Sequence, residues 1–254
     1  MLSLNMSTDE IQWRQSAPGE LINSNEVHVW RVSLDASSDE FENLLKSLSV
    51  DELARAGRFH FERDRKRFIV ARGILRKILG YYLGENPINV LFEYTAHGKP
   101  ALVPNTGNDR LCFNLSHSDA CALYAIARSN KIGIDIESVR HDIEEDLIAR
   151  KFFSQGEINS LEKIDKNKRT GLFFQYWTRK EAFIKALGQG ISFPLEQCDV
   201  SLMNGNILSP IILSGNNGKS SCWHVQDLFP GEGYVAAIAV EGGGCDISCW
   251  SYSL

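Results

Sequence analysis

The run at residues 131–137, Lys-Ile-Gly-Ile-Asp-Ile-Glu, restricts the local fold more than any other stretch of the chain. Its last four positions alternate apolar and acidic side chains. Because successive side chains of a β-strand point to opposite faces, this period predicts a strand with Asp135 and Glu137 on one face and isoleucines on the other. Taken alone, the two carboxylates fit a solvent-facing strand edge as well as a functional site.

A second run carries charge at helical spacing. Trp177, Glu181 and Lys185 recur every four residues, which aligns them along one side of a helix. Together, Asp135, Glu137 and Glu181 would supply three hard oxygen ligands of the kind that Mg²⁺ prefers. Alone, Glu181 and Lys185 form an ordinary helical ion pair that contributes roughly 0.2–0.5 kcal/mol. The motifs that precede this run favour a site.

Four motifs follow one another between residues 98 and 186. They are Gly-Lys-Pro at 98–100, Phe-Asn-Leu-Ser-His-Ser at 113–118, Gly-Ile-Asp-Ile-Glu at 133–137 and Trp-Thr-Arg-Lys-Glu-Ala-Phe-Ile-Lys-Ala at 177–186. Their order and spacing resemble the 4'-phosphopantetheinyl transferases of the surfactin-synthetase-activating (Sfp) type. Weaker similarity reaches upstream to about residue 52, and no family motif is recognised before about residue 48 or after about residue 193.

The resemblance implies an α+β fold built from two similar halves in one chain, related by a pseudo-twofold axis, with the active site between them. Residues 1–130 would form the half that binds the coenzyme A nucleotide, and residues 131–254 the half with the metal-binding acids. Local patterns agree with a mixed chain. They predict strands at 26–34, 90–94, 111–115, 120–128, 131–137, 199–202, 207–213, 221–228 and 234–240, and helices at 39–48, 51–83 with a break near Gly57, 143–153, 155–163 and 169–187.

The resemblance also implies an activity. Such enzymes transfer the 4'-phosphopantetheine group of coenzyme A to a serine of an acyl or peptidyl carrier protein and release adenosine 3',5'-bisphosphate. The nucleophile belongs to the carrier, so the enzyme mainly aligns the reactants and neutralises charge on the pyrophosphate. By resemblance, Asp135, Glu137 and Glu181 hold Mg²⁺, and Glu181, Lys185 and His117 act in catalysis, with Lys185 on the leaving phosphate.

Coenzyme A binding is implied for a partly overlapping set of residues. By resemblance they are Arg67, Lys99, Pro100, Ser116, His117 and Lys185. A basic segment supports this placement, because residues 51–80 carry nine basic and four acidic side chains, a charge of +5 (9 minus 4) in a chain of net charge −5. Arg55 matches one upstream basic position of the family, but Glu52 falls about where another lysine is expected.

The identity of the general base stays open. Glu181 could take the serine proton directly or through a metal-bound water. Glu157 matches another acidic position of the family. It also lies three residues after Ser154, the spacing of a helix capping box, which is the interpretation we favour.

Composition excludes several alternatives. A net charge of −5 gives no overall attraction to nucleic acid or an anionic membrane, and no apolar run approaches the length of a membrane span. The first 20 residues lack the pattern of a signal peptide, and six scattered cysteines indicate free thiols, so we predict a cytoplasmic enzyme. Two halves in one chain favour a monomer.

Two other classes remain as alternatives. One is a Mg²⁺-dependent nuclease or phosphohydrolase, because nucleases also combine acids with a Glu–Lys pair. Those enzymes need the pair close together on a strand, whereas here the two residues have helical spacing. A binding module that retains the fold without activity would be expected to have lost some of the acids, and all three are present.

Overall fold

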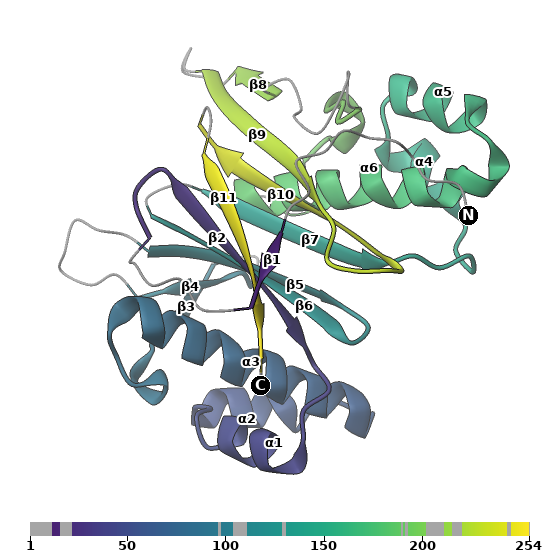
Figure 1. The fold of residues 1–254 in the computed structure, drawn as a ribbon. Helices are drawn as coiled ribbons and strands as arrows, with labels where there is room; N and C mark the ends of the chain where they lie inside the picture. The colour runs from purple at the N-terminus through teal and green to yellow at the C-terminus, as the bar shows by residue number, and fades with distance from the viewer. Residues whose placement is uncertain are drawn as a thin grey trace.

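Two sheets, each covered on its outer face by a long helix, form the body of the molecule (Figure 1). The two helices are α3 (Glu62–Leu83) and α6 (Lys166–Leu187). This arrangement confirms the predicted α+β class. The computed structural model describes residues 12–15, 22–95, 98–103, 111–128, 131–188, 190, 193–201, 211–214, 220–242 and 245–253.

The first sheet has five strands. Their order is β1 (Trp13–Arg14), β11 (Asp246–Tyr252), β2 (Glu26–Ser33), β6 (Cys121–Arg128) and β5 (Leu111–Ser118). Strand β11, from the end of the chain, lies parallel to both β1 and β2, whereas the β2–β6 and β6–β5 pairs are antiparallel. The helices α1 (Ser38–Leu45) and α2 (Val50–Ala56) flank α3 on the outside (Figure 1).

The second sheet is antiparallel. Its order is β7 (Ile132–Ser138), β10 (Tyr234–Glu241), β9 (Ser220–Leu228) and β8 (Ile211–Ser214). Two short helices, α4 (Glu145–Phe152) and α5 (Gln155–Lys163), connect β7 to α6. The remaining elements are the hairpin of β3 (Phe92–Tyr94) and β4 (Pro100–Leu102) and the single turns η1 (Pro87–Asn89) and η3 (Leu195–Gln197).

The alternation in β7 follows from its place between two layers. Ile134 and Ile136 are buried against Val29 and Leu123 of the first sheet, in the apolar layer between the sheets. The opposite face of β7 turns toward α6. Asp135 therefore lies opposite the isoleucines, as the period of the run predicts, and the structure shows that this side meets the helix.

The helix α6 lies unusually close to β7. A Cβ atom at Gly133 would be only 2.0 Å from the carbonyl oxygen of Ala182 and 2.4 Å from the nitrogen of Ala186. The glycine and the two small alanines let the helix backbone rest directly on the strand. This contact lies within the turns of α6 that carry Glu181 and Lys185.

The predicted elements agree with the structure except in particular places. The predicted break near Gly57 is confirmed, since α2 ends at Ala56 and α3 begins at Glu62. The strand predicted at 199–202 is wrong over its described residues, 199–201. There the Val200 nitrogen donates to Glu157 (2.7 Å), so its hydrogen bond goes to the start of α5 rather than to a sheet. Residues 202–210, and the boundary near residue 130, lie outside the described residues, and the pseudo-twofold relation stays a prediction.

No helix within the described stretches is long and apolar enough to cross a membrane. All six cysteines are free thiols, as their scattered spacing predicts. Cys121, Cys198 and Cys249 are buried, so for them the thiol packs as a small apolar group.

The contact at Gly133 predicts the effect of a single methyl group. Gly133→Ala should lower the free energy of unfolding by about 1–3 kcal/mol, because the helix must move away from the strand. Gly171→Ala, elsewhere on α6, is the matched control, since a Cβ there meets no atom of the described part of the chain within 4 Å. It should stabilise the protein by about 0.5–1 kcal/mol. Urea denaturation of both variants checks the difference, and equal midpoints would contradict the close approach.

Candidate active site

One cavity of about 380 Å³ gathers most of the predicted site residues. It opens where β5, β7 and α6 meet. The predicted residues that line it are Ser116, His117, Asp135, Glu137, Glu181 and Lys185, and Leu115 and Trp177 complete the wall. Residues from both sheets therefore share this cavity. The other predicted residues, Arg67, Lys99 and Pro100, lie outside its lining.

Side chains of β5 join the edges of the two sheets. The Asn114 side-chain oxygen accepts a hydrogen bond from the Ile134 nitrogen (2.8 Å), and the Ser116 hydroxyl donates to Asp135 (2.9 Å). Ser118 continues this ladder, because its hydroxyl donates to Glu137 (3.0 Å). The three β5 residues are two apart, so they share one face of the strand. Sequence reasoning missed Asn114 and Ser118, although their spacing within the motif was a usable signal.

Lys185 and Asp135 form the ion pair at the centre of the cavity. The Lys185 amine lies 2.6 Å from Asp135 Oδ1 and 2.9 Å from the Ser116 hydroxyl. Asp135 is buried, and its second oxygen, Oδ2, has no hydrogen-bond partner among the described residues. An unpaired buried carboxylate oxygen is costly, so this atom is suited to accept a cation or a donor that enters the cavity.

All three carboxylates of the cavity have a raised pKa. Burial is the largest of the effects that raise the pKa of Glu181 to about 7. The charges of Asp135 and Glu137 act in the same direction, and Lys185 opposes them. The pKa of Glu137 is raised by burial and by Asp135, and burial raises that of Asp135 despite its contact with Lys185. With all groups ionised, three carboxylates and one ammonium leave two uncompensated negative charges (3 minus 1). The cavity thus favours a cation.

The three acids of the cavity stand too far apart in this structure to hold one metal ion together. No three aspartate, glutamate, histidine or cysteine side chains in the described part of the chain stand close enough to hold one metal ion. The Lys185 amine occupies the position beside Asp135 Oδ1. An ion shared by all three carboxylates would therefore require their side chains to converge. The unpaired Oδ2 atom and the two excess negative charges fit such an ion.

His117 lies at the outer end of the cavity lining. Ser116 is buried and bound to Asp135, whereas His117 is exposed, so the two neighbours point to opposite faces and do not form a hydrolytic pair. Partial desolvation and the charges of Lys185 and Arg67 lower the pKa of His117. Arg67 is held nearby on α3, with its guanidinium 2.8 Å from Asp119.

Lys99 and Pro100 line a second, mainly apolar cavity of about 220 Å³. The Lys99 amine donates to the carbonyl oxygens of Lys185 (2.6 Å) and Ile132 (3.2 Å). Burial and the charge of Lys185 lower the pKa of Lys99 to about 8. The amine thus lies on backbone carbonyls rather than in the cavity with the three acids.

The departure at Glu52 has a structural cause. This buried carboxylate lies 2.8 Å from Arg72 and 2.7 Å from Arg76, both buried on α3. Removing one partner of such a cluster is costly, because it leaves an uncompensated buried charge. Two arginines of the basic segment therefore hold α2 to α3, and the segment's excess charge lies on other side chains.

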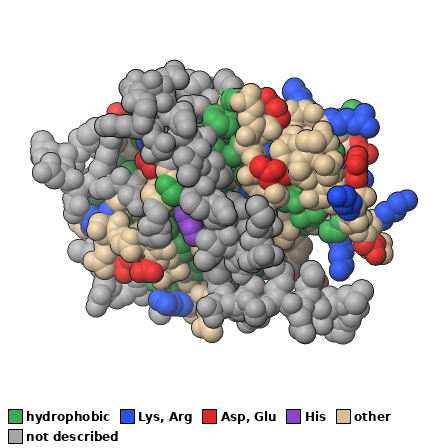
Figure 2. Space-filling view, turned by 90° about the horizontal axis from the view of Figure 1, so that it is seen from above, with side chains coloured by type: hydrophobic (Ala, Val, Ile, Leu, Met, Phe, Trp, Pro, Cys, Tyr) green, Lys and Arg blue, Asp and Glu red, His purple; other side chains and the backbone are tan. Residues whose placement is uncertain are grey.

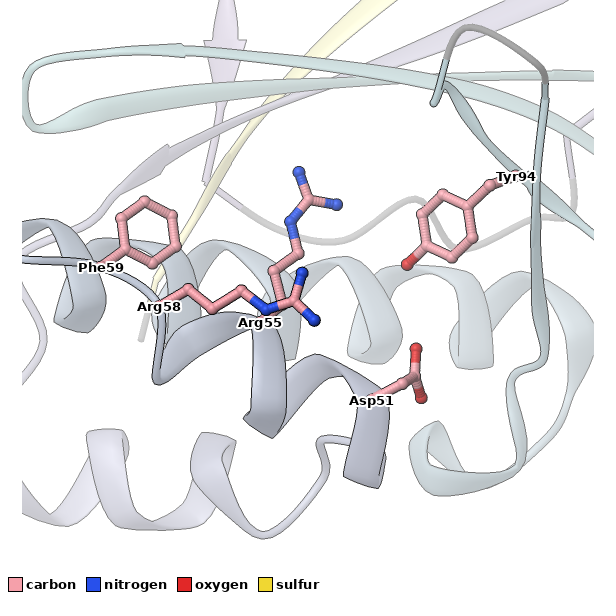
Figure 3. Close-up of a pocket in the computed structure, with 5 residues that line it drawn as sticks. All are labelled: Asp51, Arg55, Arg58, Phe59 and Tyr94. Carbon is pink, nitrogen blue, oxygen red and sulfur yellow. The ribbon is translucent and has the colours of Figure 1, made fainter.

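A third cavity of about 550 Å³ lies between α2 and the β3–β4 hairpin. Figure 3 shows the guanidinium groups of Arg55 and Arg58 pointing into the space that faces Tyr94, with Asp51 and Phe59 at its margins. Both arginines are exposed. Arg58 and Tyr94 were missed by sequence reasoning, because nothing in their local pattern shows that the hairpin lies across from α2.

Glu157 is a structural residue. It completes the capping box with Ser154, as predicted, since the Ser154 nitrogen donates to its carboxylate (2.8 Å) and its own nitrogen donates to the Ser154 hydroxyl (3.1 Å). The buried Lys180 amine lies 2.9 Å from the same carboxylate. Glu157 is fully buried and lines none of the three cavities.

Comparison with known proteins identifies the class to which this fold and site belong. A model described as "4'-phosphopantetheinyl transferase, N-terminal" matches residues 32–129, and one for the 4'-phosphopantetheinyl transferase superfamily matches residues 131–239. The chain belongs to this superfamily and is an enzyme of the Sfp-like type. The family's reaction is transfer of phosphopantetheine from coenzyme A to carrier proteins.

Curated relatives agree over most of the chain. The chain is 40% identical to the 4'-phosphopantetheinyl transferase HetI of Nostoc sp. over 94% of its own length and 98% of that protein. It is 31% identical to the transferase Sfp of Bacillus subtilis, over 65% of this chain and 71% of that one. Among solved structures, a holo-(acyl-carrier-protein) synthase from Bacillus anthracis in complex with CoA matches 44% of this chain and 94% of its own, with 19% identity and a TM-score of 0.30.

The coupling among the acids predicts a change in proton affinity. Asp135→Asn should lower the pKa of Glu181 below its value of about 7, because of the two neighbouring carboxylates Asp135 raises that pKa more. Glu137→Gln should lower it less. Carbon-13 NMR titration of the Glu181 carboxyl, in protein treated with a chelator, measures both. Asp246→Asn, an exposed change on β11, is the control. An unchanged Glu181 pKa in Asp135→Asn would contradict the coupling.

Proposed function

We propose that this enzyme transfers the 4'-phosphopantetheine group of coenzyme A to a serine hydroxyl of an acyl or peptidyl carrier protein, with Mg²⁺, and releases adenosine 3',5'-bisphosphate. The observation that carries the proposal is the shared cavity, in which three carboxylates of raised pKa surround one lysine. A reaction at a pyrophosphate needs cations on the phosphate oxygens and a fixed line of attack. We further propose that the enzyme acts as a cytoplasmic monomer.

Asp135, Glu137 and Glu181 are the residues that would hold the metal. Their oxygens are hard ligands, and the unpaired Oδ2 of Asp135 and the excess negative charge support the assignment. When bound, Mg²⁺ supplies Lewis-acid stabilisation of charge on the pyrophosphate. Because no three such groups in the described residues yet stand at ligand distance, the carboxylates would converge only when the ion and coenzyme A enter.

The remaining residues of the cavity orient and neutralise the diphosphate. Lys185, four residues after Glu181 on α6, has its amine in the cavity beside Asp135, from where it would neutralise charge on an oxygen of the leaving phosphate. Ser116 and His117 approach the diphosphate from β5. Of the two candidate bases, Glu157 is tied to Lys180, so Glu181 is the acid that remains for the serine proton.

The nucleotide end of coenzyme A would extend from this cavity toward α2 and α3. Arg67 lies close enough to influence His117, and the cavity at Arg55 and Arg58 offers two exposed guanidinium groups beside Tyr94. Guanidinium groups bind phosphates through paired hydrogen bonds, and an aromatic ring can contact a base. Glu52 provides no phosphate contact, because Arg72 and Arg76 hold its carboxylate.

The carrier protein would approach beside α4. Phe152 on this helix contacts Trp177, which lines the cavity, with ring centroids 5.7 Å apart. Leu147 on α4 is 62% exposed, and Lys151 is exposed near it in sequence. Figure 2 shows basic, acidic and apolar side chains intermixed toward the end of the molecule that carries α4 and α5. An apolar contact bordered by cations suits an acidic carrier.

Incubation with an apo carrier protein, coenzyme A and Mg²⁺ tests the function, with the mass of the carrier as the readout. The wild-type enzyme should add one phosphopantetheine group. Asp135→Asn should lower kcat/KM about a hundredfold or more, because it disturbs both the ion and the pyrophosphate, whereas Asp246→Asn should match the wild type. No mass gain on any of several carriers would refute the proposal, and full activity of Asp135→Asn would remove that residue from the site.

The cavity in Figure 3 predicts a binding effect. Arg58→Ala should raise the KM for coenzyme A about tenfold and change kcat little, because the side chain would hold a remote part of the substrate equally in the ground and transition states. Dephospho-coenzyme A, which lacks the 3'-phosphate, should be less affected. Arg63→Ala is the control, since that exposed arginine pairs with Asp64. Equal losses on both substrates would show that Arg58 does not touch the 3'-phosphate.

A further inference from the structure

The amine of Lys99 connects two elements that carry the proposed reaction centre. It donates to the carbonyl oxygen of Ile132, the first residue of β7, and to that of Lys185, in the last turn of α6. Three residues beyond Ile132 on the same strand is Asp135, which binds the side chain of Lys185. Lys99 therefore holds the main chain of Lys185, and the side-chain amine of Lys185 in turn contacts the buried carboxylate of Asp135.

Local hydrogen bonds hold the backbone around Lys99. Gly98 adopts a left-handed conformation (φ 76°), which favours glycine, and its nitrogen donates to the Thr95 oxygen (2.8 Å). The Lys99 nitrogen donates to the Thr95 hydroxyl (3.1 Å) and Pro100 begins β4. The Gly-Lys-Pro motif thus fixes the backbone on both sides of Lys99.

The end of α6 is a favourable place for a cation. The last carbonyl groups of a helix have no following helical amide, and the helix dipole gives them partial negative charge. Lys99 meets this end from outside, while Gly133 allows the helix backbone to rest on β7. Both contacts hold the last turns of α6 close to the strand.

We propose that Lys99 is a positioning residue that acts through the Lys185 backbone, rather than a ligand of a coenzyme A phosphate. It fixes the last turn of α6 against β7, so that the Lys185 amine meets Asp135 and Glu181 faces the strand carboxylates. The inference rests on the proposed function for its catalytic consequence. Its structural part does not depend on that function.

The test compares Lys99→Met with Lys131→Met. Lys131 lines the same cavity and pairs with Glu241 at 3.2 Å, so it is the matched control for loss of a positive charge there. Hydrogen–deuterium exchange at residues 184–188 reports the last turn of α6, where the Gly188 nitrogen donates to Ile184 (2.9 Å). Lys99→Met should speed exchange there about tenfold, as expected for local loosening of one turn. Lys131→Met should leave it unchanged.

Steady-state kinetics with coenzyme A and dephospho-coenzyme A complete the test. Lys99→Met should lower kcat about tenfold to a hundredfold on both substrates, because a shift of about 1 Å in a positioning element costs that much. The KM for each should stay within about twofold. Lys99→Arg, which can still donate to two carbonyls, should restore part of both the rate and the protection.

A different pattern would overturn the proposal. If Lys99→Met kept kcat and the exchange at 184–188 and raised the KM for coenzyme A but not for dephospho-coenzyme A, Lys99 would be a phosphate ligand. A wild-type enzyme that modifies no carrier would refute the function alone. The exchange comparison would then still decide whether Lys99 holds α6.

Discussion

The direct contact between α6 and β7 at Gly133 is the constraint on which the candidate site depends. Any side chain at this position would meet the backbone of Ala182 or Ala186 at 2.0–2.4 Å. Because the helix rests on the strand, Glu181 and Lys185 share a cavity with Asp135 and line it together. Three acids that share a cavity with one lysine are costly to bury in their charged forms. For this reason the pKa of Glu181 is raised to about 7. A cation that enters the cavity relieves it.

Hydrogen bonds between β5 and β7 join the two sheets. Asn114, Ser116 and Ser118 reach from β5 to β7, and two of their four hydrogen bonds to that strand go to the carboxylates of the cavity. The motif therefore orients the acids as well as connecting the layers. His117, between two of these residues, faces the other way and is left exposed beside the cations of Lys185 and Arg67. A single run of β5 thus connects the two sheets and orients the acids, and both Ser116 and His117 line the cavity.

Local patterns predicted what depends on local geometry. Alternation predicted that Asp135 lies on the face of β7 opposite the isoleucines, and four-residue spacing predicted that Glu181 and Lys185 share one face of α6. Contacts between distant segments were not predictable in this way. Three features depend on partners far away in sequence. They are the place of β11 between β1 and β2, the pairing of the buried Glu52 with Arg72 and Arg76, and the hydrogen bond from Val200 to Glu157. The resemblance to the transferase family supplied the activity, while the direction of the Lys99 amine required the structure.

Mn²⁺ binding measured by electron paramagnetic resonance, with and without coenzyme A, tests most directly whether the carboxylates form a cation site. The wild-type enzyme should bind Mn²⁺, and coenzyme A should tighten binding, because its diphosphate supplies further oxygen ligands. Asp135→Asn should weaken binding at least about tenfold, since loss of even an outer-shell partner costs about that much. Equal affinity in the wild type and in Asp135→Asn, with coenzyme A present, would contradict the account.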